Sequence, residues 1–112
     1  MGLLDKNNKN DINSIFVDVS IYYDLEPYKI DILISKVKQM IQTNLNRVMD
    51  DKDYTLKQLY YLWAGVAAPC DLRNFAIDYD RIFDEIDITL TENYSGDSVC
   101  IMSIQIDLDY KP

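Results

Sequence analysis

The stretch Asp71–Asp109 constrains the fold most, because its hydrophobic period changes once within it. Up to Ile86 the apolar residues follow a helical spacing, at Leu72, Phe75, Ala76, Tyr79, Ile82, Phe83 and Ile86. From Asp87 onward apolar and polar residues alternate, which is the period of a half-buried strand. We therefore predict a helix over 72–86 that feeds a β-hairpin, whose turn at Glu92–Asp97 uses Gly96 for a positive φ.

The preceding chain supplies the elements that cover this hairpin. Ser14–Tyr23 alternates between apolar and polar residues and predicts a strand. Tyr28–Met49 has apolar residues at i, i+3, i+4 and i+7 and predicts a long helix. Thr55 is the expected N-cap of a second helix, from Leu56 to about Trp63, and Asp71 that of the third. The predicted fold is α+β, with three helices packed on one face of a three-stranded, mainly antiparallel sheet in the order β-α-α-α-β-β. The N-terminal strand could pair with either hairpin strand.

Length and charge limit the kinds of partner that the chain can bind. A chain of 112 residues, 48% of them hydrophobic, suits one domain, so we expect a flexible arm over residues 1–13 and a single domain over 14–112. The formal net charge of -8 repels phosphate groups, which argues against direct binding to nucleic acid or to an acidic membrane. The N-terminus lacks the apolar core of a signal peptide, and we expect a cytoplasmic protein.

Several residue types needed for common enzyme chemistry are missing. The chain has no histidine, three glycines, and two cysteines that are not in a Cys-x-x-Cys pattern. We therefore expect no enzyme activity, no metal and no cofactor. The alternative is a carboxylate metal-dependent enzyme using Asp80, Asp84 and Asp87. Cys70 and Cys100 are expected as reduced thiols, with a disulfide between them as the other possibility.

Acidic and aromatic side chains are the candidate binding residues. Carboxylates crowd the end of the predicted third helix, where Asp80 and Asp84, at i and i+4, would share a face. In the second helix the apolar residues can fill the inner face, which leaves Tyr60 or Tyr61 exposed, as is typical of protein-binding surfaces. The alternative is that the acidic face is only solvated and that the tyrosines only cover the sheet edge. The predicted partner-binding residues are Asp78, Asp80, Asp84, Asp87, Asp107, Asp109, Tyr60 and Tyr61.

One segment resembles a known group of proteins. Thr55–Ala76 contains Thr-Leu-Lys-Gln-Leu-Tyr, then Trp, then Arg-Asn-Phe-Ala. This pattern is similar to Thr-Leu-Lys-Asp-Leu-Phe…Trp…Arg…Phe in small uncharacterised domains of Gram-positive phages and mobile elements. The resemblance covers about a fifth of the chain, and Arg73-Asn74 replaces the Gly-Arg pair expected before the Phe. It implies a phage or mobile-element origin and no particular activity.

These observations favour a small non-catalytic protein that binds and modulates or inhibits a protein partner. In one specific form the partner is a nucleic-acid-handling host defence or regulatory protein, and the carboxylates imitate the phosphates of DNA. A different class is a phage structural protein that self-assembles, for instance as a homodimer, through an exposed sheet edge.

Overall fold

The structure, a computed structural model, describes residues 15–67 and 71–109. The predicted arm over 1–13 and Cys70 lie outside these ranges. The elements in chain order are β1 (Phe16–Ile21), α2 (Pro27–Thr43), α3 (Leu45–Asp50), α4 (Lys52–Val66), the 3-10 turn η1 (Leu72–Asn74), β2 (Phe75–Ile82), β3 (Glu85–Tyr94) and β4 (Asp97–Asp107).

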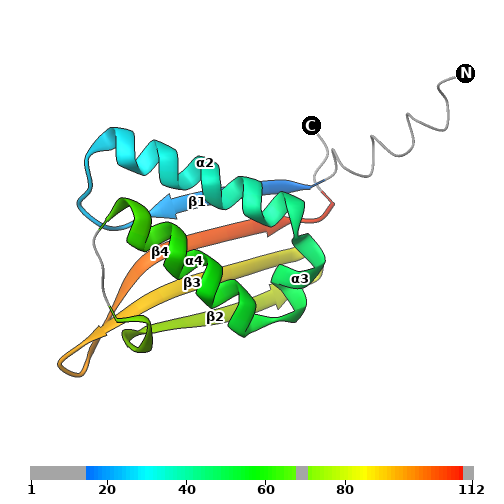
Figure 1. Cartoon of the computed structure of the whole chain (residues 1–112). Helices are drawn as coiled ribbons and strands as arrows, with labels where there is room; N and C mark the ends of the chain where they lie inside the picture. Colours follow the sequence, from blue (N-terminus) through cyan, green and yellow to red (C-terminus); the bar gives the residue numbers. More distant parts are fainter. Residues whose placement is uncertain (1–14, 68–70, 110–112) are drawn as a thin grey trace, which may run out of the picture.

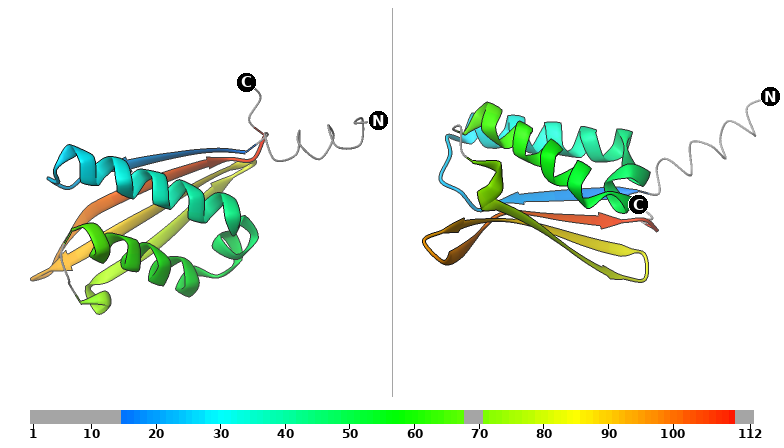
Figure 2. Two further views of the ribbon diagram at one scale, coloured as in Figure 1. Left: turned by 45° about the horizontal axis from the view of Figure 1, so that its top comes forward. Right: turned by 60° about the horizontal axis from the view of Figure 1, so that its bottom comes forward.

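The described chain forms two layers, a sheet and a layer of helices on one side of it (Figures 1 and 2). The sheet is antiparallel throughout, with the strand order β1-β4-β3-β2. In the helix layer, which comprises α2, α3 and α4, α2 packs against β1 and α4 against β2. The α+β class is confirmed, but the prediction of three strands is wrong, because the sheet has four.

The extra strand comes from the segment 72–86, where the predicted helix is wrong. After η1, this segment forms β2, which pairs with β3 from Phe75 opposite Glu92 to Ile82 opposite Glu85. The apolar residues of 72–86 fit a helical period, but Phe75, Ile77 and Tyr79 also alternate with polar or small residues. Pairing with β3 favours the period of two, and aspartate is a poor residue for a helix interior.

The N-terminal half follows its prediction more closely. The predicted strand is β1, and it pairs with β4 rather than with β3. The predicted long helix is interrupted at Asn44, whose φ of -126° and ψ of 40° separate α2 from α3. Helix α4 begins earlier than predicted, since Asp51 is its N-cap and accepts a hydrogen bond from the Tyr54 backbone N–H at 3.0 Å. Thr55 is therefore not the cap.

Gly96 has the predicted backbone role, whereas Asp71 caps a different element from the one predicted. Gly96 has a φ of 91° in the β3–β4 turn, and its neighbour Ser95 also has a positive φ. Asp71 is an N-cap, although of η1 rather than of a long helix, and accepts a hydrogen bond from the Arg73 backbone N–H at 2.9 Å. Its hydrogen bond with the Arg73 guanidinium lowers the pKa of the Asp71 carboxyl below its ordinary value.

The core lies between the sheet and the helix layer. Its fully buried side chains come from one face of each helix and from alternate positions of the strands. Side chains repeat with a period of 3.6 residues in a helix and two in a strand, so these are the positions that face the core. They include Leu33, Val37, Ile41, Leu59, Ile86, Ile88, Leu90, Met102, Ile104 and Ile106. Because all described helices cover the same side, the other residues of each strand point away from the core on the opposite side of the sheet.

A buried hydrogen-bond cluster connects the helix layer to β2. The Thr55 hydroxyl lies 2.9 Å from the Val48 carbonyl oxygen and 3.0 Å from that of Asp51. The Tyr79 hydroxyl of β2 donates to the same Val48 carbonyl. That carbonyl belongs to the last turn of α3, where helices leave acceptors without an intrahelical partner. The cluster therefore satisfies a helix end and connects α3, α4 and the edge strand β2.

Candidate protein-binding face

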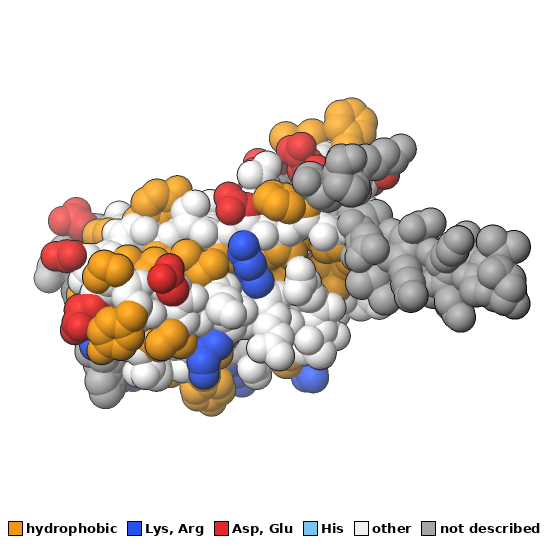
Figure 3. Space-filling view, turned by 90° about the horizontal axis from the view of Figure 1, so that it is seen from above, with side chains coloured by type: hydrophobic (Ala, Val, Ile, Leu, Met, Phe, Trp, Pro, Cys, Tyr) orange, Lys and Arg blue, Asp and Glu red, His pale blue; other side chains and the backbone are white. Residues whose placement is uncertain are grey.

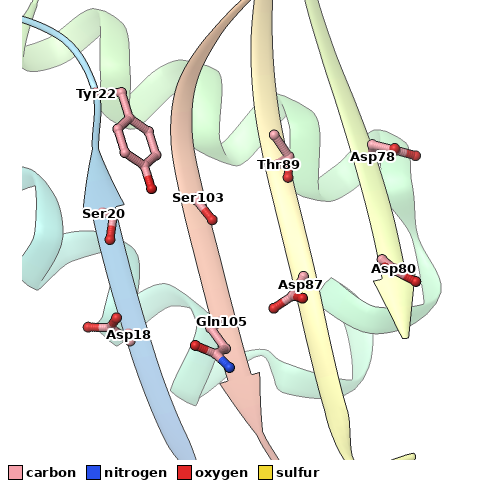
Figure 4. A pocket seen from close by; sticks show the side chains of 9 residues that line it. All are labelled: Asp18, Ser20, Tyr22, Asp78, Asp80, Asp87, Thr89, Ser103 and Gln105. Carbon is pink, nitrogen blue, oxygen red and sulfur yellow. The ribbon is translucent and has the colours of Figure 1, made fainter. Parts of the chain in front are cut away.

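The side of the sheet away from the helices carries a shallow hollow of about 520 Å³ (Figure 4). We call this surface the open face. Its residues come from alternate positions of the four strands and from Tyr22, which directly follows β1. They are Asp18, Ser20, Tyr22, Asp78, Asp80, Asp87, Thr89, Ser103 and Gln105.

The strand register arranges these polar residues in rows across the sheet. One row runs through Asp18, Gln105, Asp87 and Asp80, from β1 to β2. The next row consists of Ser20, Ser103, Thr89 and Asp78. Directly opposite side chains of neighbouring strands have Cβ atoms about 5 Å apart, and alternate residues of one strand are about 7 Å apart. The open face therefore holds its carboxylates at short, fixed spacings on a rigid element.

The four open-face carboxylates, Asp18, Asp78, Asp80 and Asp87, form no ion pair within the described residues. Asp80 and Asp87 lie directly opposite each other, and like charges in this position destabilise a sheet. The four strands contain a single basic residue, Arg81. Arg81 directly follows Asp80 in β2, so the two side chains point to opposite sides of the sheet. The Arg81 guanidinium donates a hydrogen bond to the Phe83 carbonyl at 3.3 Å. The strand layer thus concentrates negative charge without compensating it.

The helix layer has a different charge distribution. Six basic residues and three acidic residues occupy its helices, and on the side of the molecule that carries α2 the two signs are interspersed (Figure 3). These residues are Lys29, Asp31, Lys36, Lys38, Arg47, Asp50, Lys52, Asp53 and Lys57. The excess negative charge of the described chain is therefore greatest on the strands.

The structure divides the predicted acidic residues between two neighbouring areas. Asp78, Asp80 and Asp87 lie on the open face. The other three line a second hollow of about 390 Å³ at the β2–β3 turn, together with Ile82, Phe83 and Glu85; they are Asp84, Asp107 and Asp109. The predicted pairing of Asp80 with Asp84 on one helix face is wrong, because Asp80 is in a strand and Asp84 is in the turn.

The two predicted tyrosines lie in the other layer. Tyr60 and Tyr61 belong to α4, and the Tyr60 ring packs edge-on against Phe75 at 5.5 Å and against Tyr61 at 5.8 Å between centroids. Tyr61 is 61% exposed, but on α4 it is separated from the open face by the sheet. Asp18 and Gln105 complete the row that contains Asp80 and Asp87, but they are not among the predicted binding residues. The alternation within Ser14–Tyr23 predicts that Asp18 lies on the outer side of its strand. The pairing of β1 with β4 is the further information that assigns Asp18 to this row.

The β2–β3 turn carries an exposed aromatic residue in a strained backbone conformation. Phe83 is 91% exposed and has a φ of 55°, a region in which bulky residues are outliers. Asparagine tolerates this region, so we expect Phe83→Asn to raise the free energy of unfolding by about 1 kcal/mol in urea denaturation. Phe83→Ala removes the same ring but keeps the energetic cost of a positive φ, and is expected to leave the free energy of unfolding nearly unchanged. Equal effects of the two substitutions would contradict strain as the cause.

Within residues 15–67 and 71–109, no three His, Cys, Asp or Glu side chains come close enough together to hold a metal ion. Cys100 has a free, half-buried thiol, and the predicted alternative of a bridge to Cys70 involves a residue outside the described ranges. None of the described helices has the length and apolar character needed to cross a membrane.

Comparison with family models, with curated proteins and with solved structures gives no match. The resemblance of Thr55–Ala76 to domains of phages and mobile elements therefore stays a prediction.

Proposed function

We propose that this chain is a non-catalytic binding protein whose open face docks onto a basic surface of a partner protein. The observation that carries the proposal is the row of uncompensated carboxylates, in which Asp80 directly opposes Asp87. Opposed like charges cost stability. A surface needed only for solubility avoids that cost by interspersing both signs, as the helix layer does. A partner that supplies Lys and Arg side chains to the open face would neutralise the row.

The specific form that we favour is a partner that handles nucleic acid. Its basic groove normally receives phosphates, and carboxylates held on a rigid sheet can occupy the same positions. Binding would then exclude nucleic acid, so the chain would act as an inhibitor. A phage or mobile-element origin is consistent with such a role, since inhibition of a host defence or regulatory protein would benefit the element.

The test compares two variants that have equal net charge. In the face variant Asp18, Asp78, Asp80 and Asp87 are replaced by Asn. In the control variant the replaced residues are Asp24, Asp31, Asp50 and Asp53, which lie in the helix layer or beside it. A partner is captured with the tagged wild-type chain from a lysate of a Gram-positive bacterium at low salt. It is then purified and titrated with all three chains by calorimetry.

We expect the face variant to bind the purified partner at least about a hundredfold more weakly, while the control variant binds within about threefold of wild type. Duplex DNA added to the titration should compete with the wild-type chain, and a photo-crosslinking residue at Thr89 should label the partner where one at Ser35 does not. Equal loss in both variants would show a mere net-charge effect and contradict the proposal. Recovery of the bait alone, as a defined oligomer, would favour self-assembly instead.

A further inference from the structure

Strand β2 presents a long unpaired edge next to the open face (Figures 1 and 2). Its eight residues pair with β3 on one side, and no described residue forms a backbone hydrogen bond with its other side. Neither a proline nor a register shift interrupts its pairing, the one irregularity of the β3–β4 ladder lying at Leu90/Thr91. Such an edge is a template on which another extended chain can add a strand.

The two sides of β2 differ in chemistry, and this difference defines what an added strand must carry. Asp78 and Asp80 project onto the open face. Ile77 and Tyr79 are half-buried and pack against the core on the helix side. A fifth strand beside β2 would continue both sides of the sheet, with its alternate residues next to the carboxylates and the others next to the apolar side.

We infer that β2 receives an extended segment of the partner in which basic and apolar residues alternate. This inference rests on the proposed function and specifies how the partner binds. The basic residues would lie beside Asp78 and Asp80, and the apolar residues would extend the layer formed by Ile77 and Tyr79. Main-chain hydrogen bonds provide affinity in this mode, and the alternating side chains provide selectivity.

A second copy of this chain is a poorer occupant of the same edge. Antiparallel pairing of two β2 strands centred on Tyr79 would place Asp78 of each copy opposite Asp80 of the other. Directly opposed like charges are destabilising, and aspartates of this kind are a usual means of protecting a sheet edge from self-association. The other edge strand, β1, is shorter and contributes one open-face carboxylate, Asp18. Charge complementarity therefore favours β2 and a basic segment.

The test uses defined peptides and the full chain, so it does not depend on finding the partner. The probe is an end-blocked heptapeptide, Lys-Val-Lys-Val-Lys-Val-Lys, and its control, Lys-Lys-Lys-Lys-Val-Val-Val, has the same composition and charge. Backbone amide signals of the chain are followed by NMR during each titration in low salt. We expect the alternating peptide to shift the amides of Phe75–Ile82 and to bind at least about tenfold more tightly than the control.

Two further comparisons separate strand addition from simple charge attraction. N-methylation of every Val amide or of every Lys amide blocks one edge of the peptide, because alternate N–H groups of a strand point to the same side. One of the two methylated peptides should lose binding while the other keeps it. Asp78→Asn combined with Asp80→Asn should weaken binding about fivefold, and Asp31→Asn with Asp53→Asn should not.

The inference is overturned if both methylated peptides bind alike, or if the control peptide Lys-Lys-Lys-Lys-Val-Val-Val binds as tightly as the alternating peptide. It is also overturned if no backbone amide signal of β2 shifts at millimolar peptide. Dimerisation through β2, detected by sedimentation without peptide binding, would overturn it in favour of a second copy. A failed peptide titration together with a partner whose affinity depends on the four open-face carboxylates would reject the added strand and leave the proposed function standing. Peptide binding at β2, together with a partner affinity that does not depend on the four carboxylates, would reject the proposed function and leave the β2 edge as a peptide-binding site.

Discussion

Replacing Asp80 by Lys is expected to raise the free energy of unfolding by about 0.5 to 2 kcal/mol and to weaken binding to the proposed basic partner. The substitution removes the like-charge pair with Asp87 and puts an opposite charge directly across from it. Each of these changes is worth about 0.2 to 1 kcal/mol in a cross-strand pair. Urea denaturation at 20 mM NaCl measures the gain, and calorimetry with the purified partner measures the loss.

The control for this prediction is Asp31→Lys on the exposed surface of α2, which changes the net charge by the same amount. If the open-face row is the source of the repulsion, Asp31→Lys should stabilise much less and leave partner affinity unchanged. Salt should also stabilise the wild-type chain more than the Asp80→Lys variant, because screening relieves repulsion that the variant lacks. Equal stabilisation by both substitutions would assign the effect to net charge alone.

Two unusual features of the sheet are each expected to lower stability beside the proposed binding surface. Asp80 opposite Asp87 and Phe83 at a positive φ both reduce stability locally, and both lie at the same end of the β2–β3 hairpin. Strained or self-repelling residues persist where they serve binding. Under the proposed function, we therefore expect substitutions that stabilise this hairpin to be the most harmful to partner binding.

The sequence predicts the class of the fold but not the number of strands, and the reason lies in 72–86. Phe75, Tyr79, Ile82 and Ile86 repeat with a helical period, while Phe75, Ile77 and Tyr79 repeat with a period of two. Local periodicity cannot choose between them, because the decision depends on pairing with β3, a contact made by the fold as a whole. Where no such competition exists, as in β4, the periodicity predicts the element correctly.

The candidate site shows the same limit. The carboxylates Asp78, Asp80 and Asp87 were predicted as one surface, and the structure does bring them together, although through a strand pair and not through a helix face. The sequence does not predict Asp18 as a site residue, because it does not determine which hairpin strand pairs with the N-terminal strand. The sequence predicts that Tyr61 is exposed, as the carboxylates are, but exposure alone does not tell which side of a sheet a residue occupies.

The largest loss of stability is expected when both side-chain donors to the Val48 carbonyl are removed. Thr55→Val and Tyr79→Phe should each lower the free energy of unfolding by about 1 kcal/mol, because each leaves one donor in place. The double variant should lose about 3 kcal/mol, more than the sum, since the buried carbonyl then has neither side-chain partner. Thr55→Ser keeps the hydroxyl and serves as control. Strict additivity in the double-mutant cycle would show that the two donors do not share an acceptor.

The alkaline pH dependence provides an independent check on Tyr79. Burial, with a further contribution from the Asp51 carboxylate, raises the pKa of the Tyr79 hydroxyl above its ordinary value. The unfolded chain therefore ionises this group first, near pH 10, so the stability that Tyr79 contributes is complete below that pH and is lost as the pH rises through the folded pKa. The difference in unfolding free energy between wild type and Tyr79→Phe should be constant from pH 7 to 9 and shrink toward pH 11. A difference that stays constant to pH 11 would show that folding does not raise the pKa of the Tyr79 hydroxyl, and would contradict its burial beneath the helix layer.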